Sequence, residues 1–168
     1  MKKQSGIKAV IEPNIGISKK DREISIDILN GILADEFVLL IQTLRYHWNL
    51  VGPEFNDYHK LLDGQYRQIF DMIDDVAERV RKVGGISLGA MAEFMKNSQL
   101  KEDTGDIPAP REMIRRLLDQ HEGLIRSIRD GINKTGEKNR DMGTNNFLCE
   151  LIEKHEKIAW MLRSLAER

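Results

Sequence analysis

The positions of the four prolines constrain the fold more than any other feature of this 168-residue sequence. Pro13, Pro53 and Pro108 fall outside the stretches in which apolar residues follow helical spacing, and Pro110 falls at the first turn of one, where proline is well tolerated. Because proline interrupts helices, the stretches between these positions are free to form long helices. We find no convincing strand pattern and no internal repeat, so the sequence predicts an all-α fold.

Apolar residues three or four positions apart predict four long helices. Breaker residues separate them: Gly52 and Pro53 follow the first helix, Gly84-Gly85 follows the second, and residues 136–143 part the third from the fourth. A short amphipathic stretch, 88–95, lies between the second and third helices. The expected long helices cover residues 21–49, 54–83, 110–135 and 144–167.

A long crossover between the second and third helices is typical of the ferritin-like four-helix bundle. The sequence therefore predicts such a bundle, with a short helix in the crossover. We expect residues 1–20 to form a flexible, locally basic tail and residues 21–168 to form the bundle domain. A chain of this length can bury one sizeable core.

Composition excludes several classes of protein. Charged residues are 32% and hydrophobic residues 40%, a balance typical of a soluble globular protein. The 26 basic and 27 acidic residues exclude a uniformly basic nucleic-acid binder. Cys149 is the only cysteine, which excludes an intrachain disulfide and favours a reducing cytoplasm. The longest apolar run, residues 37–41, is too short for a membrane span, and no signal-peptide pattern begins the chain.

His59, Asp63, Asp74 and Glu78 share one face of the second expected helix. The first two and the last two are each four residues apart, and about three helical turns separate the pairs. Histidine combined with carboxylates suits a divalent first-row metal such as iron. Asp63 and Asp74 would nevertheless lie roughly 16 Å apart along the helix axis, so this helix alone cannot close a metal site.

These four positions are symmetric about the centre of the helix, between residues 68 and 69. Two copies packed antiparallel about a two-fold axis would bring the histidine–aspartate half of one chain against the aspartate–glutamate half of the other. The spacing therefore predicts two equivalent metal sites shared between subunits. His47 ends the first helix and can reach the neighbourhood of His59 across a short turn. The alternative is a solvated polar face without metal.

A set of short motifs runs through nearly the whole chain from residue 20 onward. They are His47-Trp48-Asn49, Gly52-Pro53-x-Phe55, His59-x-x-Leu62-Asp63, Asp74-x-x-Ala77-Glu78-Arg79, Gly84-Gly85, Asp141-x-x-Thr144, Phe147-Leu148 and Trp160-Met161-Leu162. Together they resemble the Dps family, the DNA-binding proteins from starved cells. The resemblance implies a hollow dodecamer of ferritin-like subunits that oxidises Fe(II), preferably with hydrogen peroxide, and stores ferric mineral inside.

The resemblance also implies the ligands of the ferroxidase site. They are His47, His59 and Asp63 from one subunit, with Asp74 and Glu78 from its two-fold partner. An ordinary ferritin site inside one subunit is not expected, because no histidine here has glutamate three residues before it. We therefore expect an iron-binding ferroxidase that protects against oxidative damage.

Other residues have two interpretations each. Trp48 is either a neighbour that tunes oxidation at the site or a buried packing aromatic. Glu137 and Asp141 lie where the family builds acidic three-fold pores for iron entry, and the alternative for Asp141 is a helix N-terminal cap. His121 and His155 follow apolar stripes and are expected to be hydrogen-bonded core or interface histidines rather than ligands.

The basic residues of the tail raise the question of DNA. In the family, DNA binding usually depends on basic termini, and many members lack it. Lys2, Lys3 and Lys8 would carry nonspecific DNA contacts here, whereas a tail that only aids solubility is the alternative. The main functional alternative is a nucleoid-compacting protein in which ferroxidase activity is secondary, and a metal-free helical scaffold is the third. We expect a cytoplasmic homo-oligomer, nucleoid-associated if it binds DNA.

Overall fold

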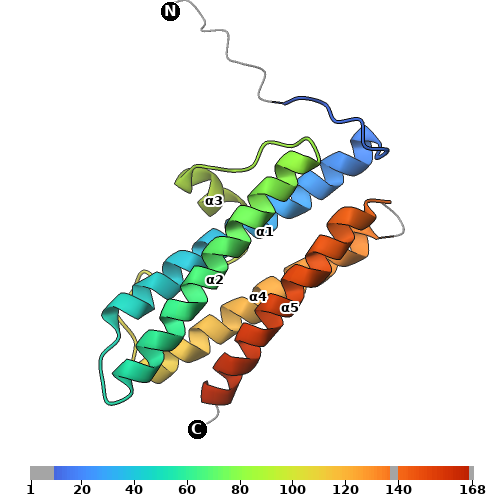
Figure 1. The fold of residues 1–168 in the computed structure, drawn as a ribbon. Coiled ribbons are helices and arrows are strands. Elements are labelled where there is room, and N and C mark those ends of the chain that lie inside the picture. The colour runs from blue at the N-terminus through green and yellow to red at the C-terminus, as the bar shows by residue number, and fades with distance from the viewer. Residues whose placement is uncertain (1–9, 137–139, 167–168) are drawn as a thin grey trace, which may run out of the picture.

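Five helices make up the part of the chain that the computed structural model describes, residues 10–136 and 140–166. No strand occurs among these residues. Four long helices with a short one in the crossover confirm the expected bundle (Figure 1). The helices are α1 (Lys19–Asn49), α2 (Phe55–Lys82), α3 (Met91–Asn97), α4 (Pro110–Thr135) and α5 (Met142–Ala166).

Capping side chains set the start of two helices. Ser18 accepts a hydrogen bond from the backbone N–H of Asp21 at 3.1 Å, so α1 begins two residues before the expected position. Asp141 accepts from the backbone N–H of Thr144 at 3.0 Å, and α5 likewise begins two residues early. Such caps satisfy N–H groups that have no partner inside the helix.

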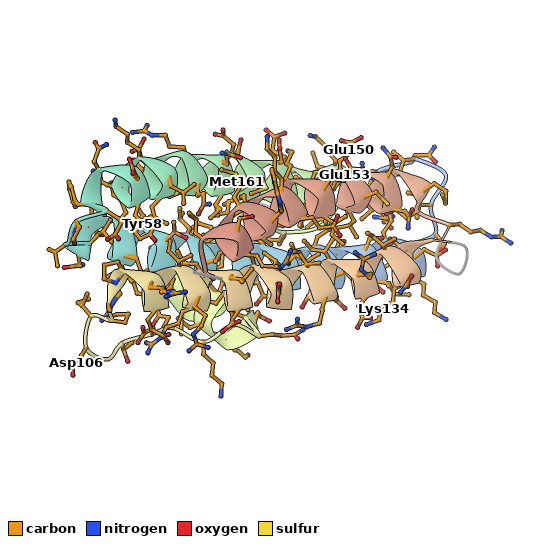
Figure 2. The ribbon with its side chains drawn as sticks, turned by 90° about the horizontal axis from the view of Figure 1, so that it is seen from below. Tyr58, Asp106, Lys134, Glu150, Glu153 and Met161 are labelled. Carbon is orange, nitrogen blue, oxygen red and sulfur yellow. The ribbon has the colours of Figure 1, made fainter. Side chains whose placement is uncertain are left out.

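The long helices form two hairpins. α1 lies alongside α2, and α4 lies alongside α5, with α1 packed against α4 (Figure 1). Side chains fill the space between the helices, whereas the exposed charged groups of Lys134 and Asp106 lie at the periphery (Figure 2). The core is centred on fully buried leucines and isoleucines from all four long helices, among them Leu29, Leu33, Leu62, Ile69, Leu117, Leu124, Ile128, Leu148 and Leu162.

The crossover between α2 and α4 is tied along α1 by buried or half-buried polar side chains. Asn30 donates to the carbonyl of Ile86 at 3.1 Å, and Asp35 accepts from the backbone N–H of Gln99 at 2.6 Å. Farther along α1, the Tyr46 hydroxyl donates to Asp103 at 2.7 Å. These contacts lie on both sides of α3 in the sequence and hold the crossover along α1, against which α3 packs.

The segment before α1 also contacts the bundle. Glu12 pairs with the buried guanidinium of Arg22 at 2.8 Å. Pro13 lies so close to Gly84 that a Cβ there would come within 2.5 Å of it, and Gly84 has a φ of +86°. Glycine is therefore required where the expected stop signal ends α2. Within the described residues, no helix is long and apolar enough to span a membrane.

Candidate metal centre

His47 and His59 face each other across the turn that joins α1 to α2. Their rings stack with centroids 3.9 Å apart and planes 19° from parallel. Nδ1 of His47 lies 3.1 Å from the carbonyl oxygen of His59, and Nδ1 of His59 lies 3.2 Å from the carbonyl oxygen of His47. The two side chains that the sequence predicted to be neighbours are thus brought together within one chain.

These contacts define the chemistry of both rings. A carbonyl oxygen only accepts hydrogen bonds, so each Nδ1 carries a hydrogen, and the atom left free on each ring to bind a metal is Nε2. Burial, followed by the nearby charge of His59, lowers the pKa of His47 below its ordinary value. His47 is therefore neutral near pH 7 and presents Nε2 as a metal-binding atom.

Asp63 lies one turn beyond His59, and two neighbours hold its carboxylate. Arg67 donates to it from two nitrogens at 3.0 and 3.1 Å, and the Tyr66 hydroxyl donates at 2.8 Å. These hydrogen bonds, first from Arg67 and then from Tyr66, lower the pKa of Asp63. Tyr66 also places its ring edge-on to His47, with centroids 5.3 Å apart. The carboxylate is thus ionised and oriented beside the histidine pair.

Asp74 and Glu78 lie exposed on the distal part of α2. Lys82 pairs with Glu78 at 2.9 Å. Asp63 and Asp74 are separated by about three turns of one continuous helix, so their side chains cannot meet. Among residues 10–136 and 140–166 of one chain, no three His, Cys, Asp or Glu side chains gather closely enough to hold a metal ion.

An apolar side chain lies between the two acidic halves of α2. Phe70 is 61% exposed and falls near the centre of symmetry of the predicted ligand positions. A single exposed phenylalanine is ordinary on a protein surface, so only its place between the two acidic halves sets Phe70 apart. One chain therefore presents a half-site of two histidines and an aspartate, an exposed aromatic residue, and a separate pair of carboxylates.

The structure shows the surroundings of two residues that have two interpretations each, Trp48 and Asp141. Trp48 is 69% exposed, so the interpretation as a buried packing aromatic is wrong for a single chain. Asp141 is fully buried, and its carboxylate accepts hydrogen bonds from Thr144 and Ser25 and pairs with Arg79 at 3.2 Å. Burial alone would raise its pKa, but these hydrogen bonds and the charge of Arg79 lower it. The contacts are those of the capping alternative, and this carboxylate does not face solvent.

Four expected functional residues lie outside the described part of the chain. Glu137, the other proposed pore residue, falls in the segment 137–139, and the tail lysines fall in the segment 1–9. The lysines are Lys2, Lys3 and Lys8.

Sequence reasoning missed a buried polar chain at the centre of the bundle. Nδ1 of His121 lies 3.1 Å from Nδ1 of His155, and Nε2 of His155 lies 3.1 Å from a carboxylate oxygen of Glu36. All three side chains are fully buried. The expectation that both histidines are hydrogen-bonded core residues is confirmed. The missed signal is Glu36, which occupies an apolar position of α1.

Comparisons with known proteins show which family the chain belongs to. A family model described as a ferritin-like domain matches residues 26–168. An uncharacterized low temperature-induced protein of Nostoc is 44% identical over 92% of this chain and 86% of its own length. A DNA protection during starvation protein of Agrobacterium fabrum is 31% identical over 83% of this chain and 85% of its own.

A solved structure shows that the similarity extends to the three-dimensional fold. The Dps protein of Vibrio cholerae, described as a member of a broad superfamily of ferritin-like diiron-carboxylate proteins, superposes with a TM-score of 0.85. It is 29% identical to this chain, and the match covers 94% of this chain and 98% of the other.

Proposed function

Because this chain belongs to the Dps family of ferritin-like proteins, we propose that it is a ferroxidase that oxidises Fe(II) and stores the ferric product. Iron storage and protection are the functions that family membership supports. The finer proposal is that hydrogen peroxide is the preferred oxidant and that each iron site is shared by two subunits. Oxidising iron while consuming peroxide would protect the cell from oxidative damage.

The stacked pair of His47 and His59 is the observation that carries this proposal. Both rings are held by Nδ1, which leaves two Nε2 atoms beside the ionised carboxylate of Asp63. Imidazole and carboxylate ligands together suit iron. Further ligands are needed, since these three side chains do not form a closed metal-binding cluster in the single chain.

A second copy of α2 would supply the further metal ligands that one chain lacks. In an antiparallel pair, the exposed Asp74 and Glu78 of one subunit would lie opposite His59 and Asp63 of the other, with Phe70 near the two-fold axis. We therefore propose a two-fold dimer with two iron sites as the building unit of a hollow homo-oligomer, a dodecamer as the resemblance implies. A cytoplasmic location follows from the same proposal.

The substrate chemistry needs two iron ions close together. Two Fe(II) ions each lose one electron, and the two electrons break the O–O bond of one peroxide to give water once protons are taken up. A single ion would deliver only one electron and release a hydroxyl radical. A site with five ligands spread over two subunits has enough donors to hold a pair of ions.

A subunit-mixing experiment tests the shared site. One variant carries His59→Ala and Asp63→Ala, and a second carries Asp74→Ala and Glu78→Ala. Each alone is expected to assemble but to oxidise Fe(II) poorly, since every site loses two ligands. When the two variants are refolded together, half the dimers are mixed, and each mixed dimer has one intact site. About a quarter of the wild-type sites should then return.

The readout is the rate of Fe(II) oxidation by peroxide under anaerobic conditions, together with soluble ferric product. Native mass spectrometry establishes that mixed oligomers have formed. A site inside one subunit gives no recovery, because no single chain in the mixture is whole. Absence of recovery in proven mixed oligomers would therefore reject the shared site.

A further inference from the structure

Two of the three acidic ligands proposed above are already paired with a cation of their own helix. Asp63 binds Arg67, four residues on, through two hydrogen bonds, and Glu78 binds Lys82, also four residues on, at 2.9 Å. Asp74 differs, because no lysine or arginine lies three or four residues from it on α2. The same arrangement thus occurs once in each half of the proposed shared site.

We propose that Arg67 and Lys82 are built-in counter-cations of the shared site. They neutralise Asp63 and Glu78 while the site holds no metal, and a divalent cation displaces them when it binds. This inference rests on the proposed function, since it takes the shared site as its starting point. The two cations would regulate metal affinity and subunit assembly, which the ligands alone would not do.

The negative charge of the shared site explains why counter-cations are needed. Each shared site would gather three carboxylates with a formal charge of −3, and the two cations reduce it to −1. On a single chain the pairs are exposed, and exposed ion pairs contribute little to stability. When a partner helix covers the carboxylates, the effective dielectric constant falls and their mutual repulsion grows. Neutralisation therefore matters most in the metal-free dimer.

The geometry of Asp63 also limits how a metal can bind. One carboxylate oxygen, Oδ1, accepts from both Tyr66 and Arg67, whereas Oδ2 accepts only from Arg67. With about two lone pairs on each oxygen, only Oδ2 keeps one free. A first metal ion would meet a single oxygen of Asp63, and fuller coordination requires Arg67 to leave. Arg67 is thus a positioning residue that restrains metal affinity.

The test removes both cations and compares the result with a matched control. The test variant is Arg67→Gln with Lys82→Gln. The control is Arg115→Gln with Lys19→Gln, which removes the same two charges from exposed pairs with Glu112 and Glu23 on other helices. Because all four cationic side chains are exposed, neither variant disturbs the core.

Two readouts that do not depend on iron oxidation decide the outcome. In the metal-stripped full-length protein at low salt, sedimentation should show the test variant dissociating at about tenfold higher protein concentration than the control. High salt should abolish that difference, because it screens the carboxylates. Calorimetry with Zn²⁺, which is redox-inert, should show binding several-fold tighter in the test variant than in the control.

A third protein separates this inference from the proposed function. It carries Asp63→Asn and Glu78→Gln in addition to Arg67→Gln and Lys82→Gln, and it should assemble like the control, because no carboxylates remain to repel each other at those positions. If the test variant assembles and binds Zn²⁺ as the control does, the counter-cation role is rejected. If removal of the carboxylates leaves Zn²⁺ binding unchanged, the shared site itself is rejected.

Discussion

His47 and His59 orient each other reciprocally: Nδ1 of each ring donates to the backbone carbonyl of the other residue. The acceptors are backbone atoms, so either ring keeps its anchor when the other side chain is removed. The backbone of each histidine therefore positions the ring of the other. Loss of one side chain still leaves the other ring held in place to bind a metal. Phe55 adds a third ring that stacks on His59, with centroids 4.9 Å apart.

Substitution of one histidine should therefore remove one ligand without releasing the other. In His59→Ala, the rate of Fe(II) oxidation at limiting iron should fall by about tenfold or more, as for other losses from a metal site. The free energy of unfolding should change little, because the side chain lies at the surface end of the hairpin. Stopped-flow absorbance with peroxide and urea unfolding of the metal-free protein measure the two quantities. A fall in stability that accounts for the lost activity would contradict this interpretation.

The buried chain of Glu36, His155 and His121 predicts a pH-dependent stability. Burial, followed by the charge of His155, lowers the pKa of His121 well below 6.5. Below pH 6.5 the unfolded chain therefore binds a proton that folded His121 excludes. Stability is fully present above that pH and is lost as the pH falls, with a slope of up to about 1.4 kcal/mol per pH unit.

His121→Leu removes this titration while keeping an uncharged side chain of similar size. Burial raises the pKa of Glu36, which acts in the opposite sense and remains in both proteins. Between pH 7.5 and 5.5, the wild-type protein should lose more unfolding free energy than the variant. Urea unfolding of metal-free samples at several pH values provides the comparison. Parallel curves for the two proteins would show that His121 does not contribute.

Gly64 predicts a close approach of the partner helix. A Cβ built there meets nothing within 4 Å in the single chain, and the same is true of Gly31 in α1. Replacing a helical glycine by alanine ordinarily stabilises a helix by about 1 kcal/mol. Gly31→Ala should do so without affecting assembly.

Gly64→Ala should stabilise the isolated chain equally but weaken the dimer, because Gly64 borders the face of α2 that the partner would cover. Thermal unfolding and sedimentation at several protein concentrations distinguish the two effects. Equal assembly of the two variants would mean that the partner helix passes Gly64 at an ordinary distance.

The tail lysines predict an electrostatic mode of DNA binding. If Lys2, Lys3 and Lys8 contact DNA, binding should be independent of sequence and should weaken steeply with salt as counterions are released. Several tails on one oligomer would strengthen it through multivalency. A gel-shift comparison of the full chain with one that lacks residues 1–10 measures the contribution. Unchanged DNA binding after truncation would show that DNA contacts another surface of the protein.

Much of the fold was predictable, because apolar spacing together with the positions of proline and of the glycines in the turns delimits the long helices. The ends of α1 and α5 differ from expectation by two residues, since the caps Ser18 and Asp141 set them rather than the apolar spacing. The neighbourhood of His47 and His59 was also predictable, because a five-residue turn joins their helices. Their ring orientation was not, since it depends on where two backbone carbonyls lie.

Glu36 shows what sequence spacing cannot provide. It falls among the apolar residues of α1, directly after Asp35, and nothing in the sequence around it shows that its carboxyl is buried against a histidine. Its partner His155 lies 119 residues away and is recognised only when α5 packs against the hairpin of α1 and α2. Likewise, the pairing of Asp63 with Arg67 follows from helical spacing, but the added hydrogen bond from Tyr66 depends on side-chain conformation.

The separation of these contacts along the chain sets an order of folding. His47 and His59 are 12 residues apart, so closing the loop between them costs little conformational entropy, whereas Glu36 and His155 must close a loop of 119 residues. Contacts between residues close in sequence form early, and distant ones form late. During synthesis the histidine pair can form once α2 has emerged, before α5 has been made. The metal-binding end of the bundle thus takes shape before the polar chain at its centre joins the two hairpins.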